Sequence, residues 1–397
     1  MNQLFEGNPS MVRLARMLYV LIRQKNGVTR QVLSDQLDLP ATSLNRMLDR
    51  QIQAGLIEEY DLAVSTGGRR PGLYRLNKTG RFLLGLDWTV PAGCLILADT
   101  ALQVIARQVW TDMGTRSAAE QTAAIQLSIT RLMADQQIDV SQLLGLGLSL
   151  PGPAAAQGGP AAIQSDPSDL IGLLETKLDL PVCPVASQDA AFFAGLWQIR
   201  ESAAESLLYL TIGESVRSGM ALNGQLHDGL LVTVPIDHLL VPLPEKSGGQ
   251  ELGQVATFPA LTRRFQRSKD DPDLDWADFC RAVKDGKKKA RQIMGEAAFA
   301  VAAALYDMAC LTGSNQILVS GDVLDELPEF EQEVRAASIQ IGKRHDVQLK
   351  VTMVAGGMES RALGAAAYVL ESRLNGTPDA GQREWAQPPP QHDGPDA

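Results

Sequence analysis

Polar and cationic side chains gather on one face of the segment 41–54 when it is drawn as a helix. The opposite face is apolar, because Leu, Met and Ile residues recur there at helical spacing. The polar face carries hydroxyl, amide and guanidinium groups, those of Thr42, Ser43, Asn45, Arg46 and Arg50. Asn and Arg can form paired hydrogen bonds with adenine and guanine edges in the major groove of DNA. The segment therefore predicts a helix that contacts DNA, and a solvated helix face is the alternative.

A short basic run follows this segment. Residues 67–71 have the sequence GGRRP, which places the guanidinium groups of Arg69 and Arg70 at the tip of an expected hairpin. Arginine side chains delivered in this way fit a narrow minor groove, where the negative potential of DNA is concentrated. A basic hairpin that only aids solubility is the alternative. Together, the helix and the hairpin favour binding to duplex DNA.

Three helices and a hairpin are expected to position these groups. The apolar spacing predicts helices over 11–24, 29–37 and 41–54, and strands around 56–57 and 73–77. The second helix starts at a threonine, a favourable N-cap residue. This order of elements is typical of a winged helix-turn-helix, whose third helix enters the major groove.

Charge separates this region from the rest of the chain. Residues 1–82 contain 12 Lys and Arg against 7 Asp and Glu, whereas the remaining residues contain 24 against 39. A basic module on an acidic body indicates that only the first part meets a polyanion, although a chance fluctuation is the alternative. The net charge of −10 argues against a protein that coats nucleic acid along its whole length.

The remainder of the chain has an α/β pattern. A helix is expected over 117–135, a buried strand over 143–150 and a largely helical stretch over 274–312. The final residues are rich in Pro, Gly, Gln and Asp and are expected to be disordered. We expect a DNA-binding domain, two α/β lobes and a tail, over residues 1–80, 81–200, 201–374 and 375–397.

The cysteines and the amino-terminal residues indicate the cellular compartment. Four cysteines (Cys94, Cys183, Cys280 and Cys310) are far apart in sequence and have apolar neighbours, so we expect small core residues without disulfides. The first residues include no long uncharged apolar run. This pattern indicates neither a signal peptide nor a membrane span and predicts a cytoplasmic protein with no membrane partner.

The segment LDLPATSLNRMLDRQIQAGLI and the later STGGRRPGLYRLN are similar to the amino-terminal module of the ROK family of repressors, open reading frames and kinases. The body resembles the same family through GLGLSLPGP, LPVCPVASQDAAFFAGLW, LYLTIGESVRSGMALNGQLHDG, ILVSGDV and LGAAAYVL. The resemblance implies an actin-like (ribonuclease H-like) fold of two lobes, the fold of ATPases and sugar kinases. Residues 40–41 are Pro-Ala where repressors of the family often have Ser and Arg, which puts the base preference at that helix end in doubt.

The loops that would bind ATP depart from the family pattern. Kinases of the family have Asp-x-Gly-Gly-Thr after the first strand, whereas this chain has Asp-Trp-Thr-Val-Pro over 87–91. Glycine lets the backbone approach a phosphate, and proline has no N–H to donate. The second loop, Gly-Thr-Gly-x-Gly in kinases, is Gly-Glu-Ser-Val-Arg-Ser-Gly over 213–219, so Glu214 would repel phosphate. We therefore expect no kinase activity and no nucleotide cofactor.

The zinc and sugar sites of the family are also altered. His238 matches the family's histidine ligand, but residues 239–258 contain no cysteine, so we expect no metal. Asp189 matches the carboxylate that deprotonates the sugar in kinases and could hydrogen-bond an effector in repressors; a helix first-turn acid is the alternative. Two family glutamates fall on Pro235 and Gly253. The resemblance leaves Asp189 and His238 as effector-binding candidates, and His238 is expected to be a structural histidine.

Three functions fit these observations. The first is a repressor of carbohydrate-utilisation genes that binds a double-stranded operator as a homodimer or homotetramer and senses a sugar or sugar derivative. The second is a sugar kinase of the ROK type with an ancillary DNA-binding module, which the altered loops oppose. The third is a regulator without an effector, whose body serves only for dimerisation. The second differs from the others in its need for intact phosphate loops.

Overall fold

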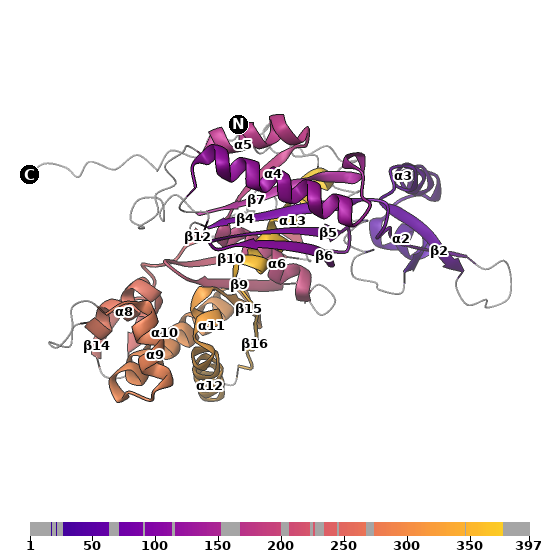
Figure 1. Cartoon of the computed structure of the whole chain (residues 1–397). Coiled ribbons are helices and arrows are strands. Elements are labelled where there is room, and N and C mark those ends of the chain that lie inside the picture. Colours follow the sequence, from indigo (N-terminus) through magenta and orange to yellow (C-terminus); the bar gives the residue numbers. More distant parts are fainter. Residues whose placement is uncertain are drawn as a thin grey trace, which may run out of the picture. The chain divides into compact units, whose positions relative to one another are not determined.

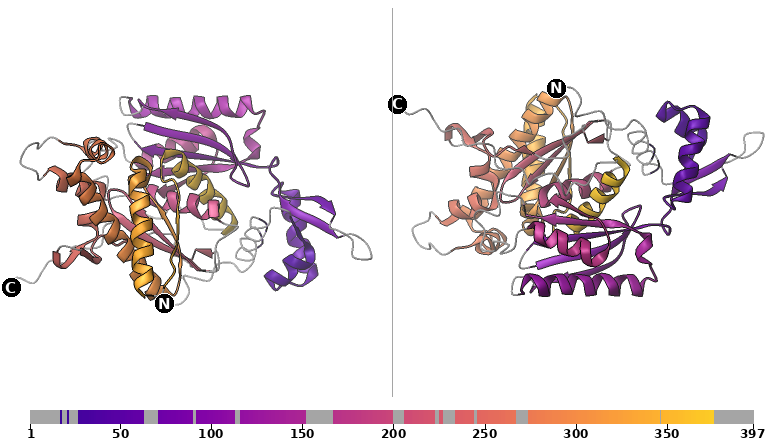
Figure 2. Two further views of the ribbon diagram at one scale, coloured as in Figure 1. Left: turned by 90° about the horizontal axis from the view of Figure 1, so that it is seen from below. Right: turned by 90° about the horizontal axis from the view of Figure 1, so that it is seen from above.

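The computed structural model describes most of the chain and divides it into two compact units. The first unit comprises 1–150, 163–185 and 365–397, and the second comprises 151–162 and 186–364. The described residues are Met17, Leu21, 27–62, 71–89, 92–112, 116–151, 167–199, 206–222, 225–226, 234–243, 246–266, 274–345 and 347–375. Figures 1 and 2 show the elements from three directions.

The first unit begins with two helices and a three-stranded sheet. The helices are α2 (Arg30–Leu37) and α3 (Ala41–Gln53), and the antiparallel sheet has the order β1 (Val28–Thr29), β3 (Gly72–Leu76), β2 (Ile57–Leu62). Leucines at helical spacing bury one face of each helix, because Leu33, Leu37, Leu44 and Leu48 are all less than 5 % exposed. The helix predicted over 11–24 lies mostly outside the described residues; Met17 and Leu21 are helical and buried.

A larger sheet forms the rest of the first unit. Its order is β6 (Val104–Trp110), β5 (Ala92–Asp99), β4 (Phe82–Thr89), β7 (Leu143–Leu150) and β8 (Val182–Ala186). The first three strands form an antiparallel meander, and β7 runs parallel to β4. Helices α4 (Ala118–Asp135) and α5 (Pro167–Leu178) lie side by side against this sheet and share its apolar core (Figure 1).

The second unit is built on a mixed sheet. The strand order is β11 (Gln225–Leu226), β10 (Val216–Leu222), β9 (Ser206–Ile212), β15 (Gln316–Ser320) and β16 (Lys350–Met353), with β12 (Val234–Pro235) also paired to β10. Alternate residues of β9 enter different cores, because successive side chains of a strand point to opposite faces. Leu207 and Tyr209 pack with Phe192 of α6 (Ser187–Ile199), whereas Leu208 and Leu210 pack with the core around α10 (Lys288–Thr312).

The remaining elements of the second unit surround α10. They are β13 (Leu240–Leu243), β14 (Lys246–Glu251), α7 (Gly253–Ala256), α8 (Phe258–Gln266), α9 (Trp276–Lys284), α11 (Asp322–Glu326) and α12 (Pro328–His345). The last helix among the described residues is α13 (Met358–Asn375). One described helix, α10, is long and apolar enough to cross a membrane by composition, and 61 % of its most apolar window is buried inside the protein. Its alanine-rich run packs in the core, which explains the composition.

Most of the predicted elements are present. The strand predicted over 143–150 is β7, and the stretch predicted to be largely helical over 274–312 consists of α9 and α10, separated at Gly286, which has a φ of 76°. Cys94 and Cys280 are buried as predicted, but Cys310 is exposed because it lies on a solvent-facing side of α10. The prediction of a core role was wrong for Cys310.

The two units do not follow continuous stretches of sequence. Helix α6 belongs to the second unit although it precedes residue 200, and the chain returns to the first unit at residue 365, within α13. The boundaries at 80/81 and 200/201 stay predictions about folding domains. Residues 376–397, predicted to be a disordered tail, lie outside the described part.

Candidate functional site

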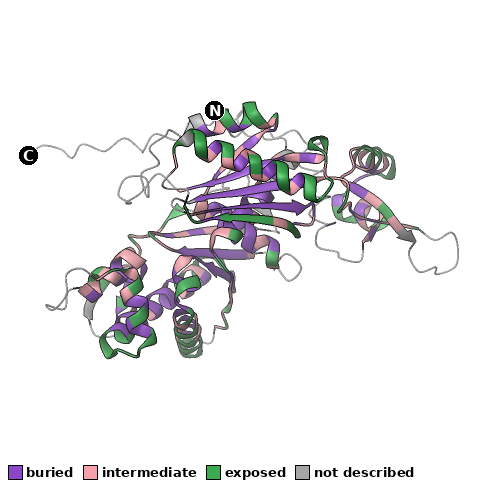
Figure 3. Ribbon diagram, in the orientation of Figure 1, coloured by how far each residue is buried: buried purple, intermediate pink, exposed green. Residues whose placement is uncertain are grey.

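Helix α3 presents the predicted polar face to solvent. Thr42, Ser43, Arg46 and Arg50 are exposed and Asn45 is half-buried, and Figure 3 shows the exposed colour along this helix. The helix is held from behind by Leu44 and Leu48, which are 1 % and 0 % exposed. The five DNA contacts predicted for this helix therefore all lie on α3, whereas the other two, Arg69 and Arg70, lie outside the described residues.

A tight turn between α2 and α3 positions this face. Thr29 caps α2 by accepting a hydrogen bond from the backbone N–H of Val32, at 3.4 Å. At the other end, Asp38 adopts a left-handed conformation with a φ of 50°, which a short polar side chain tolerates. The Ser34 hydroxyl then donates to the carbonyl of Leu39 at 2.6 Å. These contacts fix where α3 begins.

Two further polar residues lie on the exposed face of α3. Asp49 and Gln53 are exposed, and they follow Thr42 and Arg46 by seven residues, which is nearly two turns of helix. The sequence reasoning missed both, although helical spacing alone would have placed them there. Asp49 puts one negative charge among the arginines of the candidate DNA-binding face.

The hairpin behind the predicted wing is ordered by pairs of side chains. Arg75 forms an ion pair with Glu58, with Nε and Oε1 2.7 Å apart, and its guanidinium lies 4.1 Å from the centre of the Tyr60 ring. The buried Tyr74 donates its hydroxyl hydrogen to Glu59 at 2.9 Å, and burial raises its pKa. The connecting residues 63–70, with Arg69 and Arg70, lie outside the described part of the chain.

Asp189 lies in the first turn of α6 and is 5 % exposed. Near it, the buried Tyr209 shares a hydrogen bond of 2.5 Å with the hydroxyl of Ser320, and its ring packs on Phe192 with 4.3 Å between ring centres. Burial, and to a smaller extent the charges of Asp189 and Asp322, raise the pKa of Tyr209. The carboxylate thus lies near a buried pair of hydroxyl groups, those of Tyr209 in the middle of β9 and of Ser320 at the end of β15.

The turn between β9 and β10, where the family's second phosphate loop would lie, is acidic. Loss of solvent and then repulsion from Asp322 raise the pKa of Glu214. Burial and, more weakly, the same repulsion raise the pKa of Asp325, which accepts a hydrogen bond from the N–H of Gly356 at 2.9 Å. Arg361 is the nearby cation, and its Nη1 is bonded to Asp322 at 2.6 Å. A polyphosphate here would meet carboxylates and an arginine that is already paired.

Buried side chains fill the space at the carboxyl ends of β4 and β7, where the family's first phosphate loop would begin. Asp87 and Ser149, both fully buried on neighbouring strands, are joined by a hydrogen bond from the serine hydroxyl at 2.6 Å. Trp88 is 1 % exposed and packs in the core of the unit. Residues 90–91, which replace the family's glycine and threonine, lie outside the described part.

His238 is not enclosed by the protein. Its side chain is 89 % exposed, and Nδ1 lies 3.3 Å from Oε1 of Glu251. The neighbouring Asp237 accepts a hydrogen bond from the N–H of Val216 at 2.9 Å. His238 is thus an exposed residue, and its structural role stays a prediction. Among the described residues, no three His, Cys, Asp or Glu side chains are grouped closely enough to hold a metal ion.

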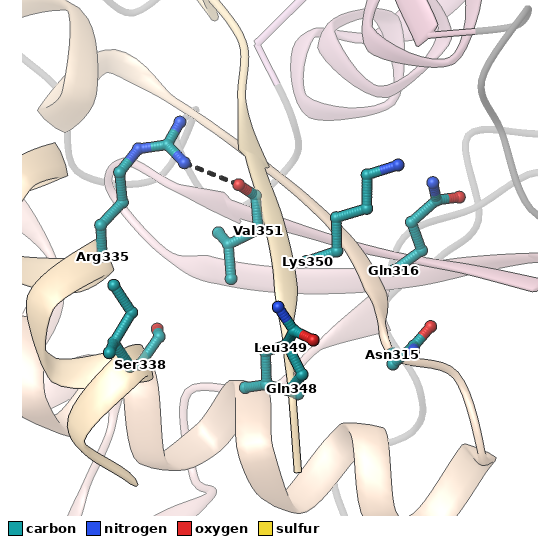
Figure 4. A pocket seen from close by; sticks show the side chains of 9 residues that line it. Asn315, Gln316, Arg335, Ser338, Gln348, Leu349, Lys350 and Val351 are labelled. Carbon is teal, nitrogen blue, oxygen red and sulfur yellow. Dashed lines mark hydrogen bonds between the residues drawn. The ribbon is translucent and has the colours of Figure 1, made fainter. Parts of the chain in front are cut away.

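A cavity of about 580 Å³ opens between α12 and the edge strand β16. It is lined by Asn315, Gln316, Arg335, Ser338, Ile339, Gln348, Leu349, Lys350 and Val351. Figure 4 shows Arg335 donating from Nη1 to the carbonyl of Val351, at 2.7 Å. This bond covers an edge carbonyl that a further strand would need. Neither predicted effector-binding residue lines the cavity.

Comparison with known proteins identifies relatives of both kinds, repressors and kinases. The profile of the ROK family matches residues 84–372. The xylose repressor of Caldicellulosiruptor bescii is 23 % identical over 56 % of this chain, and the match spans only 57 % of that repressor. The kanosamine kinase of Amycolatopsis mediterranei is 27 % identical over 57 % of this chain and 76 % of its own length.

Two matches reach beyond the α/β body. The N-acetylglucosamine repressor of Escherichia coli is 22 % identical over 90 % of this chain and 92 % of its own length. That coverage exceeds what residues 81–397 alone could supply. A solved ROK family transcriptional regulator, described as a homologue of the Escherichia coli Mlc protein, covers 92 % of this chain with a TM-score of 0.62 and 19 % identity, and 98 % of its own chain. The mixed α/β fold is therefore the ROK sugar-kinase fold.

Proposed function

The chain belongs to the ROK family, and we propose that it is a DNA-binding transcriptional repressor of carbohydrate-utilisation genes. The observation that carries the proposal is the exposed face of α3, where hydroxyl, amide and guanidinium groups stand opposite two buried leucines. A helix of this kind suits the major groove, and its arginines suit guanine edges or phosphates.

The amino-terminal elements support a winged helix-turn-helix. Helices α2 and α3 are joined by a short turn, and strands β2 and β3 would form the base of the wing that carries Arg69 and Arg70. The partner is an operator in double-stranded DNA, and the protein would act in the cytoplasm as a homodimer or homotetramer. A two-fold axis would then present two copies of α3 to half-sites about one helical turn apart.

The body is proposed to bind an effector without phosphorylating it. Asp189 is the residue we assign to effector hydroxyls, because its carboxylate lies near the buried hydroxyl groups of Tyr209 and Ser320. His238 stays a second candidate at the surface. The relatives are named for xylose and N-acetylglucosamine, so these sugars and their phosphates are the first ligands to test.

A sugar kinase is the competing function, and the kanosamine kinase match keeps it under test. The acidic turn at Glu214 and the pairing of Arg361 with Asp322 oppose it, because both disfavour a bound triphosphate. A regulator without an effector is the third function, and it differs from the first only at the effector site.

One experiment separates these functions. The purified full-length chain is used to select duplexes from a random pool, and the selected operator is then titrated with and without each sugar. A repressor with an effector binds the operator tightly and releases it with one sugar, whereas a regulator without an effector releases it with none. Failure to retain any duplex at low salt, or robust transfer of phosphate from ATP to a hexose, would overturn the proposal.

A further inference from the structure

The segment between β3 and β4 is held by hydrogen bonds to the amino-terminal module and to the larger sheet of the first unit. The N–H of Asn77 donates to the carbonyl of Leu56 at 2.9 Å, and the hydroxyl of Thr100 donates to the carbonyl of Asn77 at 2.9 Å. The Asn77 side chain also accepts hydrogen bonds from the N–H groups of Thr79 and Gly80, at 3.1 and 3.0 Å. One residue thus joins the small sheet of the amino-terminal module to the larger sheet of the first unit.

Arg81, at the end of this segment, connects the end of α3 with the larger sheet. Its Nε donates to the carbonyl of Ala54, the C-cap residue of α3, at 2.7 Å. Its Nη1 donates to the carbonyl of Ser141 at 2.5 Å, directly before β7. The last carbonyls of a helix have no partner within the helix, and a cation is favourable there. One planar guanidinium therefore donates to a carbonyl at the end of α3 and to a carbonyl just before β7.

The backbone directly before Arg81 lies close to the backbone that follows α3. This close approach leaves little room for a different placement of α3 relative to residues 80–81. A Cβ on Gly80 would lie 2.3 Å from the carbonyl oxygen of Gly55. Gly55 itself has a φ of 74°, a conformation that favours glycine. The receiving side is also ordered, because Asp139 and Gln142 cap the short turn that contains Ser141. The contact is thus built from several independent features.

We propose that Arg81 is a positioning residue that holds α3 in one direction relative to the β4–β7 sheet. This rests on the proposed function, in which the body must present two copies of α3 at a set separation. The role requires the forked geometry of arginine, because the ammonium of lysine is a single point and does not span two carbonyls in the same way. Arg81→Lys therefore separates geometry from charge.

The first arm of the test needs no DNA. Spin labels are placed at Gln53→Cys on α3 and Ala123→Cys on α4, both exposed positions, with Cys183 and Cys310 changed to Ser. The full-length chain should give one narrow distance distribution. Arg81→Ala should broaden it and Arg81→Lys should restore it only in part, whereas Arg131→Ala, which removes an exposed cation from α4, should leave it narrow. Equal distributions in all four proteins would overturn the proposal.

The second arm uses the operator selected by the unaltered chain, with base pairs inserted between its half-sites. Arg81→Ala should lose roughly tenfold or more of the preference for the selected spacing, because two charge-assisted hydrogen bonds are removed. Its affinity for random duplex should match that of Arg131→Ala. An unchanged spacing preference in Arg81→Ala, or full rescue by Arg81→Lys, would refute the positioning role. If the unaltered chain binds no duplex, the proposed function fails, while the distance arm still decides the role of Arg81.

Discussion

Single charges decide how well α3 suits a polyanion. The arginines and polar groups of its exposed face attract phosphate, but Asp49 lies among them and is exposed as well. An acidic side chain on such a face has two consequences: it weakens binding to any duplex, and it can accept a hydrogen bond from the amino group of cytosine. In the proposed complex with DNA, Asp49 would therefore lower the affinity for any duplex and add selectivity for sequence.

Asp49→Asn should strengthen binding to random duplex by roughly two- to fivefold at low salt, because one exposed repulsive charge is removed. The measurement is a titration of duplex at several salt concentrations. Asp135→Asn, which removes an exposed carboxylate from the end of α4, is the matched control and should change nothing. Unchanged affinity for random duplex in Asp49→Asn would mean that α3 does not face DNA.

Glu214 is a second residue whose negative charge is unfavourable where it lies, because of burial and repulsion from Asp322. Its raised pKa means that ionisation is less favourable in the folded protein than in the unfolded chain. The resulting loss of stability is absent below its ordinary pKa of 4.5 and grows as the pH rises through the raised value.

Glu214→Gln should therefore raise the melting temperature at about pH 7, by roughly one or two degrees because the side chain is exposed, and leave it unchanged at about pH 4. Thermal melts at the two pH values provide the test. Glu333→Gln, an exposed position on α12, should show no such difference between them. An equal gain at both pH values would show that the cost of ionising Glu214, through burial and then repulsion from Asp322, is not the cause.

At the scale of elements, the hairpin of β2 and β3 has the chemistry of a wing support. Ion pairing of Arg75 with Glu58 and the hydrogen bond from Tyr74 to Glu59 hold the two strands in register. A rigid base lets a short loop present its side chains without a large loss of conformational entropy on binding. The arginines of that loop are thus the wing's proposed contribution to affinity.

Changing Arg69 and Arg70 together to Ala should weaken operator binding by a few kcal/mol and flatten its dependence on salt, because fewer counterions are released. The pair Lys343 and Arg344, exposed at the end of α12, provides a control with the same loss of charge. Affinity and salt slope are read from titrations over a range of ionic strength. Equal effects of the two double variants would contradict a wing role.

At the scale of the whole molecule, the proposed repressor couples an effector site in the second unit to DNA binding in the first. In the proposed function, Asp189 and the neighbouring buried hydroxyls of Tyr209 and Ser320 are the groups that would hydrogen-bond a polyol effector. A ligand that binds the folded state raises its melting temperature, by an amount set by concentration and affinity.

Asp189→Asn keeps the size of the side chain but removes its charge. It should bind operator as the unaltered chain does and lose the sugar-induced release, with a dissociation constant for the sugar raised roughly tenfold or more. Melting temperature and operator release are measured across the sugar panel. Asp285→Asn, an exposed position of the same unit, is the control. Normal release by Asp189→Asn would remove this residue from the effector site.

Local patterns in the sequence were sufficient for much of the fold. The recurrence of Leu, Met and Ile at helical spacing predicted α3, and the largely apolar run over 143–150 predicted β7 with its observed bounds. Both follow from spacing along one element, which tertiary contacts did not change. The same spacing places Asp49 on the candidate face, so helical periodicity is also sufficient to locate this acidic residue.

Periodicity and composition by themselves determined which segments become helices and strands and which face of α3 is polar, because both depend on neighbours a few residues away. Tertiary structure alone decided that α6 joins the second unit, that Arg81 connects Ala54 with Ser141, and that Glu214 lies near Asp322. Those relations join residues tens to more than a hundred positions apart. Only the folded chain brings such residues together. The burial of apolar surface that drives folding is non-directional, so it leaves no pattern among sequence neighbours from which these long-range contacts could be predicted.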